Sequence, residues 1–344
     1  MLALARFPVL ASNVDATAEP ALAGRLRPSV LRRFPAPGGE QTVAVIGSTT
    51  RTTPLMTADV GRVCFNDPAP VLRALVQELE AQGVNKIILL SHNGYDVDQE
   101  LARTVPGLDV IVGGHTHTLL DPAAAENPSR KTTGLKALGL SPAGPYPTLV
   151  AGPQGALVLV VQAWKWGEVL GRLSLSFDAA GRISQHSAAP ELLVSEPFSL
   201  AGAPVNPASD LGKHLRAQVL ASGAASIAEP DPALLAKLAP YAAKIAAYQN
   251  APLGAMLRTD LLRGTATDPG PLVADAYLAK VPGAHIALIS AGGIRRDLLA
   301  GLLDTDGEGT SNGGLIYSST SRQLIEDVIW LARSVGGKAQ LHPT

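Results

Sequence analysis

Two groups of histidines stand out because each follows a short apolar run. His92 follows the run at residues 87–90, and His115 and His117 follow the run at 110–112. Short runs rich in branched residues and bounded by turn residues are typical of buried parallel strands. Ligands of open α/β sheets bind beyond the carboxyl ends of the strands, and neutral imidazole is a common metal ligand. The spacing therefore predicts a metal site formed by His92, His115 and His117 at one edge of a sheet.

The segments around these runs alternate between strand and helix patterns. A further apolar run at residues 43–46 is followed by an Asp-Pro pair at 67–68, a typical helix start, and by Gly83, a typical helix end. Asp96 and Gln99 have the spacing of a capping box, so a short helix is expected between the two runs that carry the histidines. The resulting β-α-β-α-β order predicts a layered α/β fold with right-handed crossovers.

The rest of the chain predicts more strands, a broken helical stretch and a second α/β unit. We interpret Trp164 and Trp166, which lie between two of these strands, as side chains that pack against a sheet. Prolines 230, 232 and 240 are expected to break the helical stretch. The expected elements are a surface loop (121–155), an irregular stretch (185–210), strands (157–163, 170–177, 286–289) and helices (211–249 in pieces, 270–280, 321–334).

The composition excludes several classes of protein. The 344 residues carry 28 Lys and Arg against 29 Asp and Glu, so a net charge of −1 offers no broad positive surface to a nucleic-acid polymer or an anionic membrane. Cys64 is the one cysteine, which excludes an intrachain disulfide and a Cys-based zinc site. No run reaches the ~18 apolar residues of a membrane span. No basic stretch precedes an apolar run in the way of a signal peptide.

The histidine groups belong to longer blocks that resemble a known family. Ser-His-Asn-Gly at 91–94 and Gly-Gly-His-Thr-His at 113–117 resemble the calcineurin-like metallophosphoesterase domain of the bacterial 5′-nucleotidase/UDP-sugar hydrolase family. The resemblance continues at residues 7–15, 43–47 and 161–173, and residues 270–276 and 286–295 are similar to the family's C-terminal nucleotide-binding domain.

This resemblance implies a domain organisation. Residues 1–204 would form the second half of a truncated metallophosphoesterase α/β sandwich. A helical linker at 205–250 would follow, and residues 251–344 would form part of the α/β nucleotide-binding domain. Members of the family are usually exported, so the resemblance implies a periplasmic or secreted parent protein, with no signal in this chain.

The resemblance also implies metal-dependent hydrolysis of nucleotide phosphoesters. His92 and His115 would ligate the second of two divalent ions, and His117 the first, with Zn²⁺, Mn²⁺, Co²⁺ and Mg²⁺ all suitable. Such a pair of ions clamps a phosphate and activates water. The nucleotide's anionic groups would face Arg295 at a glycine turn, because the planar guanidinium gives phosphate two parallel hydrogen bonds. The implied substrate-binding residues are Arg295, Gly292, Gly293 and, more weakly, Arg263.

The chain also departs from the family pattern. No histidine precedes His92, whereas the family takes an Asp-x-His pair, a bridging Asp and a proton-donating His from an earlier segment. No catalytic residue is therefore identifiable, and we expect a fragment that lacks the N-terminal metal-binding segment. Two dications about 3.5 Å apart repel by roughly 19 kcal/mol at an effective dielectric constant of about 20. Three neutral imidazoles do not offset this repulsion, so we expect the chain as it stands to be inactive.

Two other functions stay open at this point. The chain also fits a degenerate, non-catalytic relative that acts as a binding or structural protein. It fits as well a thiosulfohydrolase of the same fold family, which shares both histidine blocks, although residues 118–120 look more like a nucleotidase. We expect a nucleotide or another phosphoester as the small-molecule partner, and nothing in the sequence indicates an oligomeric state.

Overall fold

The chain divides into two compact units, residues 1–230 and residues 231–344. The computed structural model describes residues 5–36, 39–57, 59–122, 134–200, 203–249, 270–280, 287–290 and 315–318. The first unit contains His92, His115 and His117. The boundary between the units falls inside the stretch 205–250 that the sequence predicts as a linker, and the roles predicted for the domains stay predictions.

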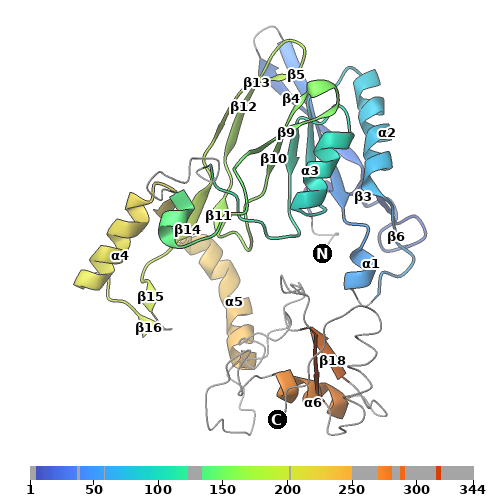
Figure 1. Ribbon diagram of the computed structural model, residues 1–344. Coiled ribbons are helices and arrows are strands. Elements are labelled where there is room, and N and C mark those ends of the chain that lie inside the picture. The colour runs from blue at the N-terminus through green and yellow to red at the C-terminus, as the bar shows by residue number, and fades with distance from the viewer. Residues whose placement is uncertain are drawn as a thin grey trace. The chain divides into compact units, whose positions relative to one another are not determined.

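A six-stranded sheet forms the centre of the first unit, with the strand order β4-β5-β7-β8-β10-β9 (Figure 1). The four inner strands run parallel, and each edge strand runs antiparallel to its neighbour. The α/β fold with parallel strands predicted from the apolar runs is thereby confirmed. The strands are β4 (Ser29–Ala36), β5 (Gly39–Thr49), β7 (Ile87–His92), β8 (Val110–Val112), β10 (Leu157–Val161) and β9 (Thr148–Ala151).

Two helices, α2 (Pro68–Ala81) and α3 (Tyr95–Thr104), pack against this sheet (Figure 1). The start of α2 is as predicted, because Asp67 accepts a hydrogen bond from the backbone N–H of Ala69 at 3.1 Å. Burial of apolar side chains is the main favourable term that attaches an amphipathic helix to a sheet. The buried cluster between the helices and the sheet includes Leu72, Val76, Leu79, Leu101, Ala102, Val105, Ala44, Ile46, Ile87, Leu89 and Ile111.

The start of α3 differs from the predicted capping box. Gly94 occupies the N-cap position, and Asp96 lies inside the first turn. The hydroxyl of Thr116, from the loop that carries His115, accepts a hydrogen bond from the N–H of Tyr95 at 3.1 Å. Gly94 permits this approach, because a Cβ there would lie 2.8 Å from Thr116 Cγ2. A side chain distant in sequence thus replaces the local cap.

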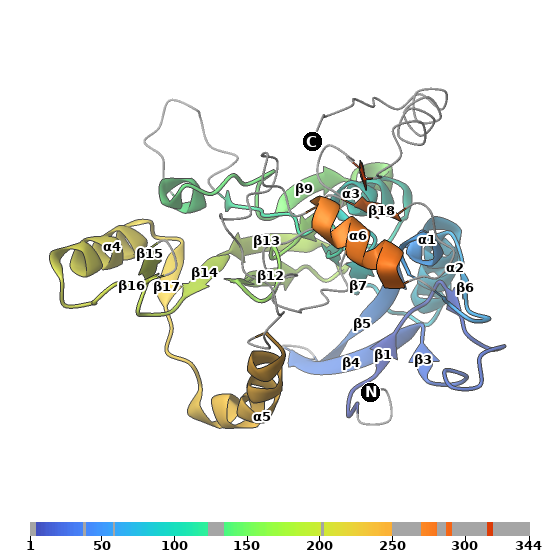
Figure 2. The ribbon, with the colours of Figure 1, turned by 90° about the horizontal axis from the view of Figure 1, so that it is seen from below.

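Shorter elements surround the main sheet. Figure 2 shows β1 and β3 beside β4 and β5, and a Cβ at Gly47 of β5 would lie 2.5 Å from Leu10 of β1. The elements are β1 (Val9–Leu10), β3 (Leu26–Arg27), β2 (Val14–Asp15), β6 (Cys64–Phe65), β11 (Val169–Leu170), β12 (Leu173–Phe177), β13 (Ile183–Ala188), β14 (Glu191–Val194), β15 (Ser199–Leu200), β16 (Ala203–Pro204), β17 (Ala225–Ile227), α1 (Thr53–Met56), α4 (Asp210–Ala221) and two 3₁₀ helices (Gly134–Leu138, Pro153–Gly155).

Several expected elements of this unit are wrong in detail. The predicted loop at 121–155 contains the edge strand β9, and the predicted irregular stretch at 185–210 contains β14 to β16. The single strand expected at 170–177 is divided into β11 and β12 near Gly171, where a Cβ would lie 2.6 Å from Tyr146 Oη. The pairing partners of these short strands are distant in sequence, so local patterns do not reveal them.

The second unit contains α5 (Pro232–Gln249), α6 (Gly270–Lys280) and an antiparallel pair, β18 (Ala287–Ser290) and β19 (Leu315–Ser318). The helix and strand expected at 270–280 and 286–289 are confirmed as α6 and β18. Pro240 was expected to break a helix, but α5 continues through it, since proline removes one helix hydrogen bond and a long helix keeps the others. The helix expected at 321–334 lies outside the described residues. Of the helices that are described, none is sufficiently long and apolar to cross a membrane.

Neighbouring residues of β7 test which face of the sheet carries the core. Leu89 is buried in the cluster with α2 and α3, whereas Leu90 lies on the opposite face and is 44% exposed. We expect Leu89→Ala to lower the free energy of unfolding by about 2–5 kcal/mol, because the truncation leaves a cavity. Leu90→Ala is the matched control and should cost about 1 kcal/mol or less. Urea denaturation followed by circular dichroism measures both, and equal losses would contradict this assignment of faces.

Candidate functional site

The carboxyl ends of β7 and β8 bring two of the predicted histidines together. His92 is the last residue of β7, and His115 lies in the loop that follows β8. The parallel register pairs Leu90 with Val112, so both strands end at the same edge of the sheet. The imidazole rings of His92 and His115 lie 5.1 Å apart between centroids and are tilted by 57°.

Two glycines allow the loop after β8 to pass close to β7. A Cβ at Gly114 would lie 3.3 Å from His92 Nδ1, and a Cβ at Gly113 would meet the carboxyl oxygen Oδ2 of Asp98. Glycine is found where a backbone must approach another group closely. The glycine pair is therefore required by the packing around the two histidines.

A buried carboxyl contacts both strand ends. Asp98 of α3 is fully buried and accepts a hydrogen bond from Ser91 Oγ, on the residue before His92. Its other oxygen, Oδ2, is buried without a hydrogen-bond partner among the described residues and lies beside Gly113. Asp98 thus links the strand end of His92 to the turn that precedes His115.

Two buried amide side chains add to this support. Asn93 Nδ2 donates to Ser48 Oγ at 3.1 Å, which ties the end of β7 to β5. Gln162, directly after β10, donates from Nε2 to the carbonyl of Gly114 at 3.0 Å and accepts from the N–H of Thr118. Asp98, Asn93 and Gln162 are parts of the site that the sequence pattern did not predict. For Asn93 and Gln162 the signal was available, because each is a polar residue at the end of a buried apolar run.

The third predicted ligand, His117, lies against an aromatic side chain. Its ring centroid is 6.0 Å from that of Trp166, at an interplanar angle of 66°. Trp164 packs against the apolar cluster around Leu119, as the sequence predicted. The same expectation for Trp166 is wrong, since Trp166 is 57% exposed beside His117. The structure thus places an exposed indole next to one of the candidate metal ligands.

The imidazoles of His92 and His115 are the neighbouring donors that could share a metal ion. Among the residues that the structure describes, no group of three or more His, Cys, Asp or Glu side chains could hold an ion. Zinc in proteins takes three or four protein ligands, so two imidazoles are only part of a coordination shell. The described part of the chain does not complete a metal centre, and the three-histidine site stays a prediction.

The residues predicted to bind the substrate cannot be placed in this site. Gly292, Gly293, Arg295 and Arg263 lie outside the described residues, and their roles stay predictions. A positive charge does lie beside the aromatic neighbour of His117, since Lys165 Nζ is 4.1 Å from the ring centroid of Trp166.

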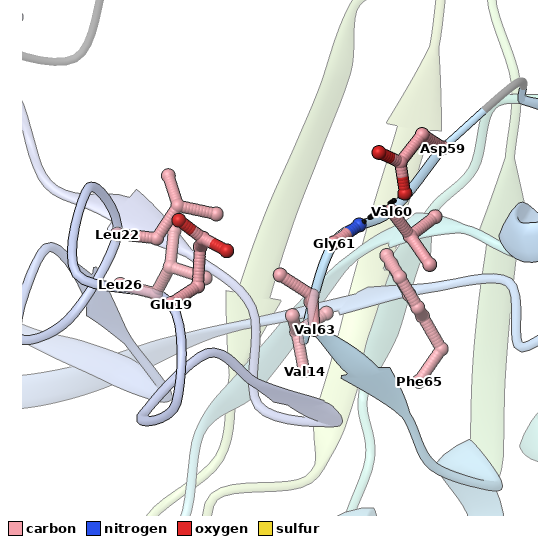
Figure 3. A pocket seen from close by; sticks show the side chains of 9 residues that line it. All are labelled: Val14, Glu19, Leu22, Leu26, Asp59, Val60, Gly61, Val63 and Phe65. Carbon is pink, nitrogen blue, oxygen red and sulfur yellow. Dashed lines mark hydrogen bonds between the residues drawn. The ribbon is translucent and has the colours of Figure 1, made fainter.

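A separate hollow of about 490 Å³ lies between residues 14–26 and 59–65 (Figure 3). Its lining is apolar apart from two carboxylates, one of which, Asp59, accepts a hydrogen bond from Gly61 N at 2.7 Å. The hollow contains none of the three histidines, so we do not assign the phosphoester chemistry to it. The lining residues are Val14, Glu19, Leu22, Leu26, Asp59, Val60, Gly61, Val63 and Phe65.

Comparisons with known proteins identify similar sequences and similar folds. The human 5′-nucleotidase is 35% identical over 195 residues, which are 57% of this chain and 32% of that protein. The crystal structure of a 5′-nucleotidase precursor from Thermus thermophilus is 36% identical and matches 86% of this chain and 50% of its own, with a TM-score of 0.58. The NAD nucleotidase of Haemophilus influenzae, 24% identical, shares the fold over 85% of this chain and 53% of its own, with a TM-score of 0.63.

This chain spans about a third of the length of the curated relatives it matches and about half of the two solved structures. No protein-family model matches it. The comparisons confirm the similarity to the 5′-nucleotidases and an α/β fold shared with the two solved structures.

Burial raises the pKa of the Asp98 carboxyl from 3.8 to about 7, although the hydrogen bond from Ser91 partly opposes this effect. The folded state therefore holds a proton on Asp98 that the unfolded state releases above pH 3.8. The contribution of this group to stability is complete below that pH and is lost as the pH rises to about 7.

Asp98→Asn should remove this pH dependence, because an amide does not titrate. We expect the free energy of unfolding to fall less steeply between pH 4 and 7, by up to about 1.4 kcal/mol per pH unit relative to the parent protein. Urea titrations at several pH values measure the slope. Asp96→Asn, an exposed change in the same helix, is the control and should leave the slope unchanged. An unaltered slope in Asp98→Asn would show that Asp98 ionises normally in the folded protein.

Proposed function

We propose that this chain, a relative of the 5′-nucleotidases within the metallophosphoesterase family, supplies part of the site of a metal-dependent phosphoester hydrolase that acts on nucleotides. The observation that carries the proposal is the His92–His115 pair, with ring centroids 5.1 Å apart at the carboxyl ends of adjacent parallel strands. The similarity to 5′-nucleotidases at 35–36% identity supports the substrate class.

In this proposal His92 and His115 bind one divalent ion and His117 binds the other. Further ligands come from outside the described residues. A divalent ion polarises a phosphoryl group and lowers the pKa of bound water. The chain's own contribution is orientation, because the buried Asp98 and Gln162 fix the loop that carries His115. We assign the nucleotide's anionic groups to Arg295 with Gly292 and Gly293, and more weakly to Arg263, on the resemblance alone.

The test is release of inorganic phosphate from AMP with Mn²⁺, Zn²⁺ or Co²⁺ supplied. We expect no turnover above background from the 344-residue chain alone. Its described donors leave the metal site incomplete, and loss of general-acid help alone lowers rates by about 10²–10⁴-fold. Robust turnover by the isolated chain would show that other residues of this sequence complete the site.

A chimera provides the version of this test in which activity is expected. The chain is placed behind the N-terminal half of the Thermus thermophilus relative, and we expect metal-dependent hydrolysis of AMP. His115→Ala should remove most of this activity. His186→Ala, on the exposed part of β13, is the matched control and should retain it. A folded chimera that binds metal but releases no phosphate, or one that is indifferent to His115→Ala, would contradict the proposed function.

A further inference from the structure

The turn that follows β10 contains an unexpected residue. The N–H of Glu168 donates to the carbonyl of Lys165 at 3.0 Å, and the two residues between them, Trp166 and Gly167, have φ values of 51° and 76°. Positive φ at both central positions is the mark of a type I′ turn, in which Gly, Asn and Asp predominate. A bulky residue rarely adopts this conformation, so Trp166 occupies a strained position.

Packing does not explain this choice of residue. Trp166 is 57% exposed, whereas Trp164, with φ of 58°, is partly buried against the cluster around Leu119 and Val169. Glycine would adopt the backbone conformation at position 166 without strain. Strained residues are concentrated at functional sites, and a large exposed aromatic ring in such a position points to a binding role.

The surroundings of Trp166 indicate what it could bind. β10 pairs in parallel with β8, Val161 beside Val112, so this turn lies at the same sheet edge as the histidine loop. The Trp166 ring is 6.0 Å from the ring of His117, and the ammonium of Lys165 lies 4.1 Å from the Trp166 centroid. The indole of Trp166 thus adjoins the candidate phosphoryl site, and a positive charge lies against the indole.

We infer that Trp166 and Lys165 form a platform for phosphoesters whose ester group is aromatic. The aromatic group packs on the exposed indole, the phosphoryl group lies at His115 and His117, and Lys165 balances part of its negative charge. This inference rests on the proposed function and adds a substrate class to it. Stacking on an aromatic side chain strengthens binding by roughly 5- to 100-fold.

Nuclear magnetic resonance of the 344-residue chain tests the inference, because the sequence contains 3 tryptophans and so gives few indole signals. The probes are phenylphosphonate and methylphosphonate, which share a head group that is not hydrolysed, titrated with Zn²⁺ present. We expect both probes to shift the His115 and His117 ring signals. Phenylphosphonate alone should shift the Trp166 indole signal, with at least about 5-fold tighter binding than methylphosphonate.

Variants separate a binding role from a structural one. Trp166→Gly should abolish the preference for phenylphosphonate without lowering the melting temperature, and Trp166→Phe should restore part of it. Lys165→Met should weaken binding of both probes. Leu170→Ala, another exposed apolar position nearby in sequence, is the control and should change neither affinity.

Each of the remaining outcomes overturns the inference and shows which part of it is wrong. Equal affinities for the two probes, with shifts at the histidines, would contradict the platform but not the proposed function. Shifts at Trp166 without shifts at the histidines, or no binding of either probe, would overturn the inference, whereas the proposed function is tested separately by the hydrolysis of AMP by the chimera. A lower melting temperature of Trp166→Gly with an intact preference would assign Trp166 a structural role.

Discussion

The parallel pairing of β7 with β8 is the constraint on which the histidine site depends. Because Leu90 pairs with Val112, the two strands end together and His92 meets the loop of His115. The side-chain period of a strand is two, so a slip of one residue would turn His92 toward the helices and Leu89 toward the opposite face. Burial of Leu89 and Ile111 against α2 and α3 fixes the register that prevents this slip.

Beyond the ends of these strands, buried polar groups replace apolar packing. Asp98, Asn93 and Gln162 are each at most 5% exposed, and burial of such groups costs free energy unless they are hydrogen-bonded. Their bonds to Ser91, Ser48 and the backbone of the histidine loop offset part of this cost. The bonds of Gln162 hold a loop in which His115 and His117 have positive φ, a strain of about 1–3 kcal/mol for each residue. The polar groups therefore specify the position of the imidazoles at the expense of stability.

The parts of this arrangement that local sequence determines could be predicted. Buried strands such as residues 110–112 have an apolar pattern, and Asp67 with Pro68 marks a helix start. The meeting of His92 and His115 followed from the rule that parallel strands end at one edge. The cap of α3 could not be predicted, because Thr116 supplies it from a distant loop.

The exposure of individual side chains could not be predicted from a local sequence pattern either. Two tryptophans two residues apart look alike in sequence, yet Trp164 contacts an apolar cluster and Trp166 faces solvent. Both residues have positive φ, so the difference lies in the apolar cluster against which Trp164 packs. Asp98 looked like an ordinary polar residue of a short helix, and only the close passage of Gly113 shows that it is enclosed.

A double-mutant cycle on Zn²⁺ affinity tests most directly whether His92 and His115 bind one ion together. Calorimetric titration of the 344-residue chain is compared with His92→Ala, His115→Ala and the double variant. If the pair shares an ion, either single change removes most of the affinity and the second adds little, with a coupling of about 1 kcal/mol or more. Losses that simply add, or an affinity that neither change affects, would contradict the account.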